Sequence, residues 1–254
     1  MNILIKSSKT TVAFLCLLVS YLPITAQVTN VKDKPEVQVN AIVQSYTYFT
    51  DSMYATMDWR EFIASPLAAI PIDYRDVDYN LINAAVFYYT NKYRESKRLG
   101  QLQFSPVLRD AAVFHSLEMI NRKFYDHTNP FNRSMRSAVD RTSYFKFNGS
   151  AVGENLAWQF LFDYQPGAKF WSIANGPDIN YYYGNSLKKG PDIKPVTYGQ
   201  FAERLVQEWI DSPPHRHNLE CKDFKYLGCG VVPDFRSVSR THIPEAVGTQ
   251  NFGG

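Results

Sequence analysis

The chain has 254 residues and a formal net charge of +3 at pH 7, and 45% of its residues are hydrophobic and 15% aromatic. This hydrophobic content allows a buried core, which excludes disorder for most of the chain. The near-neutral charge argues against a nucleic-acid-binding protein, which needs a clustered basic face. The length fits one well-buried domain plus an extension.

The first 26 residues have the pattern of a secretory signal peptide. A short basic stretch precedes an apolar run from Val12 to Leu22, and Ala26 closes an acceptable signal-peptidase site. The run is shorter than the roughly 20 residues that cross a bilayer, and no comparable run follows, so we expect no membrane span. Cys16 lacks the small preceding residue of a lipoprotein site. We therefore predict a secreted or periplasmic protein without a lipid anchor that begins near Gln27.

Two segments are predicted to be additions to a main domain at residues 76–254. Residues 27–75 are polar at first and then mixed and aromatic, with prolines that would interrupt a long helix, so we expect an extension that packs on the domain. Residues 160–196 contain four prolines and no strong period, which favours a surface insertion. The run at residues 181–183 of three tyrosines is either a contact platform or an ordinary packed surface.

Three helices are predicted from apolar residues at helical spacing. The first follows Asp78 and should end by Gly100, and the second begins at Ser105-Pro106, a capping residue followed by proline at the first helical position. The third should be stopped by Pro213-Pro214. The apolar positions are Ile82, Val86, Tyr89 and Tyr93 in the first helix, Leu108, Ala112, His115 and Met119 in the second, and Phe201, Leu205 and Trp209 in the third.

The remaining segments are shorter. Residues 126–153 are rich in Asn, Ser and Arg and lack a clean period, which predicts a long loop with one short helix at about residues 134–140. Residues 225–232 and 246–252 contain valine, glycine and aromatic residues and are expected to form paired strands.

Cys221 and Cys229 are the cysteines that remain after removal of a signal peptide. In an oxidising compartment their simplest interpretation is a disulfide, which would stabilise the fold by about 2 to 2.5 kcal/mol across so short a loop. A redox dithiol or half of a metal site is less favoured, because neither CxxC spacing nor a second cysteine pair is present.

No common nucleotide-binding or hydrolase motif occurs in the chain. Instead, the chain contains several short sequence motifs in a characteristic order. These motifs are Asn91-Lys92-Tyr93-Arg94, His115-Ser116, Phe124-Tyr125-Asp126-His127, Gly153-Glu154-Asn155-Leu156-Ala157, Trp209 to Leu219, Gly228-Cys229-Gly230-Val231 and Thr249-Gln250-Asn251-Phe252-Gly253.

This series resembles the CAP superfamily, which comprises cysteine-rich secretory proteins, antigen 5 and plant pathogenesis-related 1 proteins and is also called the SCP domain. The resemblance is closest to bacterial secreted members and covers about Asp76 to Gly254. It implies an α+β fold, a three-layer α-β-α sandwich around a small antiparallel sheet. It also implies a cleft in which His127 is the first histidine, Glu154 the acid and His215 the second histidine.

The second acid of the family cleft has no match in this chain. In the family this acid lies three residues after the tryptophan, and here Ser212 lies three residues after Trp209. The resemblance therefore implies a triad, unless the side chain of Glu208 or Asp211 extends into the cleft. His115, on the apolar stripe of its helix, is expected to be buried and hydrogen-bonded. His115, Asn155 and Asp211 are the residues that we expect to support the cleft.

The triad permits two chemical interpretations. The two imidazoles could hold a divalent ion such as zinc while Glu154 orients a water molecule, which would make a hydrolase of peptide or ester bonds. Alternatively, Glu154 accepts hydrogen bonds from the imidazoles and from backbone N–H groups and joins three segments. We favour a non-enzymatic binding module for a small apolar ligand such as a lipid or sterol, a peptide or a glycan. A structural component of the cell envelope is a third hypothesis.

Overall fold

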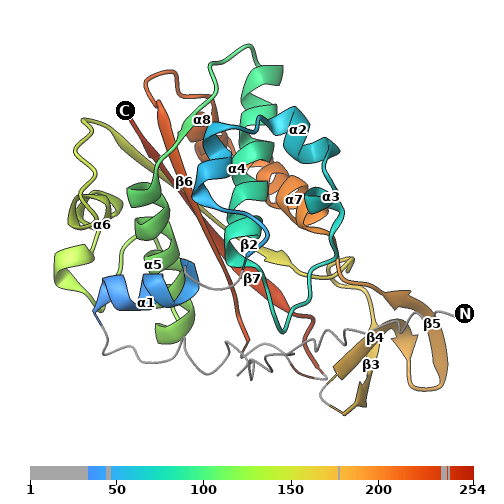
Figure 1. Ribbon diagram of the computed structural model, residues 1–254. Coiled ribbons are helices and arrows are strands. Elements are labelled where there is room, and N and C mark those ends of the chain that lie inside the picture. Colours follow the sequence, from blue (N-terminus) through green and yellow to red (C-terminus); the bar gives the residue numbers. More distant parts are fainter. Residues whose placement is uncertain (1–33, 44–46, 177, 236–238, 240) are drawn as a thin grey trace, which may run out of the picture.

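A small sheet forms the centre of the protein (Figure 1), whose computed structural model describes residues 34–43, 47–176, 178–235, 239 and 241–254. The predicted signal peptide lies outside the described residues. The sheet has the order β1-β6-β7-β2, with β1 parallel to β6 and the other neighbours antiparallel. The strands are β1 (Gln103–Phe104), β2 (Val152–Phe160), β6 (Tyr226–Pro233) and β7 (Glu245–Gly253).

Helices cover both faces of this sheet. On one face lie α4 (Tyr79–Ser96) and α7 (Tyr198–Asp211), and on the other lies α5 (Pro106–Arg122) (Figure 1). The first two predicted helices begin as expected, because the Asp78 side chain caps α4 and Ser105 caps α5, with proline at its first position. The predicted strand pair is confirmed as β6 and β7, whereas β2 was not predicted as a strand. This layering confirms the α+β sandwich.

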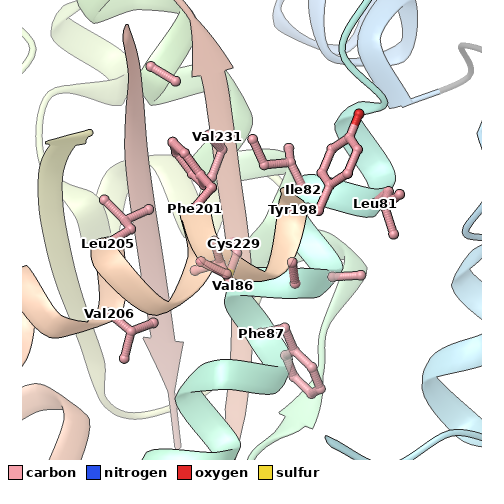
Figure 2. Close-up of a cluster of buried hydrophobic side chains, with 14 of the residues drawn as sticks. Leu81, Ile82, Val86, Phe87, Tyr198, Phe201, Leu205, Val206, Cys229 and Val231 are labelled. Atoms are coloured by element: carbon pink, nitrogen blue, oxygen red, sulfur yellow. The ribbon is translucent and has the colours of Figure 1, made fainter. Parts of the chain in front are cut away.

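The larger core fills the space between the sheet and the α4–α7 layer. Cys229 and Val231 of β6 point toward this layer, where they meet Val86 of α4 and Phe201 of α7 (Figure 2). All four side chains are at most 2% exposed. The spacing of two residues along β6 matches a strand with one face on this core, and the helical spacing of the apolar residues on α4 and α7 supplies the other wall.

The opposite face of β6 carries glycines, and they let α5 approach the sheet closely. A Cβ atom on Gly230 would lie 2.2 Å from the backbone nitrogen of Val113, and one on Gly228 would lie 2.0 Å from that of Arg109. Only a residue without a side chain fits at such positions. The alternation of Gly228-Cys229-Gly230-Val231 therefore encodes both layers of the sandwich.

The segment before α4 contains helices that the sequence pattern did not predict. Its contacts with the main domain include Arg109 Nη1 to Asp51 Oδ1 at 2.6 Å and the backbone N–H of Tyr48 to Asp78 Oδ2 at 2.6 Å. It therefore packs on the domain as expected, while the division of the chain into extension and domain stays a prediction. The helices are α1 (Pro35–Val43), η2 (Asp51–Ala55), α2 (Trp59–Ala64) and α3 (Pro66–Ala69).

The aperiodic tract at residues 160–196 folds into a second, three-stranded antiparallel sheet. Tyr181 is buried, Tyr183 donates its hydroxyl to the carbonyl of Asp163 at 2.9 Å, and the ring of Tyr182 lies 3.7 Å from Lys189 Nζ. The tyrosine run is thus mostly packed. The strands are β3 (Phe170–Asn175), β4 (Asp178–Asn185) and β5 (Lys188–Ile193).

Two helix boundaries differ from the prediction. The short helix expected at residues 134–140 is a 3-10 turn, η3 (Arg133–Met135), followed by α6 (Ala138–Tyr144), because Ser137 and Asp140 form a capping box that fixes the start of α6. The proline pair after α7 does not lead into a loop. It begins α8 (Pro213–Glu220), since proline is tolerated in the first turn of a helix.

The predicted disulfide is not formed, and both Cys221 and Cys229 are free. Cys229 lies three residues beyond Tyr226, the first residue of β6, which corresponds to about 10 Å of extended chain. Cys221 lies before the strand and is held by Arg94, which donates to its carbonyl at 2.9 Å. The strand thus carries Cys229 into the core, where it is buried, whereas Cys221 is only partly buried. Burial raises the pKa of the Cys229 thiol, so it is unreactive.

Candidate functional site

Glu154 of β2 is buried, and side chains bind both of its carboxylate oxygens. Oε1 accepts a hydrogen bond from His127 Nδ1 at 2.9 Å, and Oε2 accepts one from Arg141 Nη2 at 2.7 Å. The amide of Asn251, in the orientation that satisfies both its oxygen and its nitrogen, also donates to Oε2 at 3.2 Å. His115 Nε2 lies 3.9 Å from Oε1. The carboxylate is therefore surrounded by donors.

Arg141 is the partner that sequence reasoning missed. It projects from α6, is fully buried, and also donates to the backbone carbonyls of Arg136 at 2.9 Å and His127 at 3.0 Å. It thus neutralises Glu154 and at the same time fixes the loop that carries His127. The capping box at Ser137 is the signal that would have placed α6, and with it Arg141, correctly.

The charges around Glu154 set the ionisation of the neighbouring groups. Burial raises the pKa of Glu154, but the hydrogen bond from His127 and the charge of Arg141 outweigh it and hold the pKa below its ordinary value. The hydrogen bond to Glu154 raises the pKa of His127. Burial lowers the pKa of His115 to about 4. Burial and then the charge of His127 lower the pKa of His215. Near pH 7 the site therefore holds an ionised carboxylate beside neutral His115 and His215.

The first turn of α8 brings His215 to His127. The two ring centroids are 6.4 Å apart, with 54° between the ring planes. Asn155 Nδ2 donates to the carbonyl of His215 at 3.2 Å, and Asn218 Nδ2 donates to the carbonyl of Glu154 at 3.1 Å. These two amides join α8 to β2, and the structure thus brings His127, Glu154 and His215 together.

The other residues singled out in the sequence lie in different settings. His115 is fully buried, and its Nε2 atom donates to the carbonyl of Asp126 at 2.9 Å. Asp211 is exposed and accepts from Gln207 of its own helix at 2.8 Å, so it is not brought into the site. His217 is exposed.

Two residues close in the sequence to His127 and Glu154 form an aromatic pair. Tyr125 lies two residues before His127 and is 48% exposed, and its ring centroid is 5.9 Å from that of the partly exposed Trp158. Trp158 is on β2, on the same strand face as Glu154. Burial and then the charge of Glu208 raise the pKa of Tyr125 to about 12, so this tyrosine keeps its hydroxyl proton.

The donor atoms do not fit a catalytic zinc centre. Nδ1 of His127 and both oxygens of Glu154 are already hydrogen-bonded, which leaves His127 Nε2 and the ring of His215 as ligands. Characterised catalytic zinc sites use three protein ligands. In the part of the chain that the structure describes, no group of three or more His, Cys, Asp and Glu residues could hold a metal ion.

The chain matches one protein-family model and is similar to two solved structures. The family model of the cysteine-rich secretory protein family, CAP, matches residues 87–243. An extracellular protein containing an SCP domain from Bacillus anthracis has a similar structure, with 22% identity and a TM-score of 0.45 over 70% of this chain and 41% of that chain. An outer surface protein from Borrelia burgdorferi is similar at 15% identity and a TM-score of 0.42 over 67% of this chain and 90% of that chain.

The chain thus spans less than half the length of the Bacillus protein. No curated protein gives a match. None of the described helices is long and apolar enough to cross a membrane. The family match extends over more than half of the sequence and includes His127, Glu154 and His215. The chain belongs to the cysteine-rich secretory protein family, CAP.

Proposed function

We propose that this protein is secreted and binds a ligand at the His127–Glu154–His215 site without hydrolysing it. The proposal rests on the hydrogen bonds of the Glu154 carboxylate. One oxygen accepts from His127 and the other accepts from Arg141. A general base needs a free carboxylate oxygen within hydrogen-bond reach of a water molecule. Glu154 therefore serves to hold three segments together, and the two imidazoles serve as polar contacts.

The surroundings of the histidines favour a glycan as the ligand. Tyr125, two residues before His127, and Trp158, on the strand face of Glu154, offer partly exposed aromatic rings, and the ring nitrogens of the two histidines add polar groups. Sugar rings present C–H faces that pack on aromatic rings and hydroxyl groups that bond to imidazoles. Apolar surface with a few well-placed polar groups is the usual composition of a ligand site.

Binding is tested with a chitin tetrasaccharide and soluble peptidoglycan fragments, followed through the NMR signals of the His127 and His215 rings. We expect saturable shifts in the wild type, loss of these shifts in Tyr125→Ala, and no change in Tyr48→Ala, which removes another exposed tyrosine. Shifts caused by a fatty acid or a peptide, with none from either glycan, would contradict the glycan assignment.

A hydrolase of peptide or ester bonds is the second candidate, and one observation favours it. The bond from His127 Nδ1 to Glu154 leaves Nε2 unprotonated in the neutral ring, where it can act as a general base. The test is hydrolysis of casein and of p-nitrophenyl esters by the wild type, His127→Ala and His217→Ala, with and without added zinc. We expect equal, background rates for all three proteins. Hydrolysis that only His127→Ala loses would establish the enzyme instead.

Secretion is a separate part of the proposal and is supported by the signal-peptide pattern of the first 26 residues. Expression of the full-length gene product and intact-mass measurement of the secreted material should give a chain that begins near Gln27. An uncleaved chain retained in the cytoplasm would contradict it.

A further inference from the structure

Arg94 near the end of α4 is a buried cation that has no acidic partner in the part of the chain that the structure describes. Its side chain belongs to a residue that is 2% exposed, and it donates from Nε to the carbonyl of Gly100 at 2.9 Å and from Nη1 to the carbonyls of Leu219 at 2.8 Å and Cys221 at 2.9 Å. These three bonds fix the guanidinium group. Among the described residues no carboxylate forms an ion pair with it, and burial lowers its pKa. Its positive charge is therefore held in place but not neutralised.

One acidic residue stands next to Arg94 in the sequence and another stands between the two residues whose carbonyls Arg94 binds, and both are bound elsewhere. Glu95 accepts from Arg60, and Glu220 accepts from the hydroxyl of Tyr93 at 2.5 Å. Both carboxylates are thus hydrogen-bonded to partners other than Arg94. A charge that is fixed and unpaired in this way costs free energy in the absence of a ligand and favours the binding of an anion.

Arg94 lines a pocket of about 450 Å³ together with three exposed cations. The three hydrogen bonds of Arg94 to described residues use Nε and Nη1, so the N–H groups of Nη2 remain to bind a ligand that enters the pocket. No acidic residue lines this pocket. Its volume is within the range of small-molecule sites. The residues that matter here are Arg94, Arg98, Lys222 and Lys225, with Leu99 and Phe224 as apolar walls, and we call them the Arg94 pocket.

The helix dipole does not account for this concentration of charge. The C-terminal end of a helix attracts cations, which explains Arg98, two residues beyond the end of α4. Lys222 and Lys225 come from the segment between α8 and β6, and the bond from Arg94 to the carbonyl of Cys221 helps to hold that segment against α4. The same side chain thus helps to assemble the pocket and contributes its innermost charge.

We propose that the Arg94 pocket is a binding site for the phosphate group of a small phosphorylated ligand. A phosphate carries up to two negative charges and several acceptor oxygens, and a guanidinium group binds such oxygens through paired N–H groups. The four cations of the pocket, with no acidic residue among its lining residues, suit the charge of a phosphate better than the single charge of a carboxylate ligand. The site shares no residue with the His127–Glu154–His215 site, and the two proposals are independent.

Calorimetric titration with pyrophosphate and with inorganic phosphate, on the mature chain at low salt, tests this proposal. The test variant is Lys222→Ala/Lys225→Ala, whose two side chains are exposed, and the control is Lys169→Ala/Lys188→Ala, which removes the same charge from other exposed positions. We expect the test variant to weaken pyrophosphate binding by at least about tenfold and the control to weaken it by less than about twofold. The NMR signal of Arg94 Nε–H should shift on binding.

A second arm separates a soluble phosphate compound from a lipid headgroup. Co-sedimentation with vesicles of phosphatidylglycerol in phosphatidylcholine, in competition with pyrophosphate, shows whether the pocket accepts a phosphate on a membrane. Binding of either probe that depends on Lys222 and Lys225 supports the proposal. The proposal is overturned if neither probe binds, or if the test and control variants weaken binding equally, because that result would reflect overall charge.

Discussion

Glu154 and Arg94 are both buried and charged, but their surroundings differ. Glu154 has an opposite charge on one oxygen, a histidine N–H on the other and an amide beside them. Arg94 has three neutral carbonyls and no acid among the described residues. A buried charge is stable when ion pairs and hydrogen bonds replace its hydration. By this criterion the Glu154 network is complete without a ligand, whereas the Arg94 pocket is not.

The largest expected effect comes from removing the partner of Glu154. Arg141→Met leaves a buried carboxylate without its opposite charge, so we expect a loss of about 3 to 5 kcal/mol in the free energy of unfolding. The control Arg133→Met changes an exposed arginine and should cost less than about 0.5 kcal/mol. Urea unfolding of both variants measures the difference. Equal stability of the two variants would show that Glu154 is not held by Arg141.

His115 should make stability depend on pH. Its pKa of about 4 in the folded protein is below the ordinary value of 6.5, so the unfolded chain binds more protons between these values and stability falls as pH falls through this range. The expected loss from this group is about 3 kcal/mol. In His115→Gln this part of the pH dependence should vanish, whereas exposed His217→Gln should retain it. Identical pH profiles for wild type and His115→Gln would contradict the assignment.

Removal of Arg94 should cost less than removal of Arg141, because it leaves carbonyls without donors but no unpaired charge. We expect Arg94→Met to lower the free energy of unfolding by about 1 to 3 kcal/mol. Addition of pyrophosphate should raise the urea midpoint of the wild type and leave that of Arg94→Met unchanged. A ligand effect of equal size in both proteins would place the phosphate elsewhere.

The smallest expected effect concerns the histidine pair. The charge of His127 contributes to the lowered pKa of His215, so His127→Gln should move the pKa of His215 upward, toward its ordinary value. The NMR titration of the His215 ring in both proteins measures this shift. An unchanged pKa would mean that the two rings do not interact at the distance found in the structure.

The sequence predicted the parts of the fold whose signals are local. The caps at Asp78 and Ser105 and the helical spacing of the residues after them fixed α4 and α5. The motifs around His127, Glu154 and His215 identified the residues that the structure brings together.

The missed features depend on contacts between distant segments. Arg141 lies 13 positions before Glu154, in a tract without periodicity, so no local pattern marked the ion pair. The disulfide prediction used the number of cysteines and the expected oxidising compartment, whereas in the structure both cysteines are free and the strand β6 carries Cys229 into the core. The strands β3, β4 and β5 were missed because they show no regular alternation of apolar and polar residues, and because β4 and β5 contain glycine and β5 also proline.

The ionisation of Glu154 tests the central claim most directly. Selective ¹³C labelling of glutamate and an NMR titration of the Glu154 carboxyl carbon, assigned with Glu154→Gln, report its pKa. We expect a pKa below the ordinary value of 4.5, because His127 and Arg141 stabilise the charged form more than burial destabilises it. A carboxyl that titrates above this value would be a protonatable acid or base, and it would contradict the assignment of Glu154 to structure rather than to catalysis.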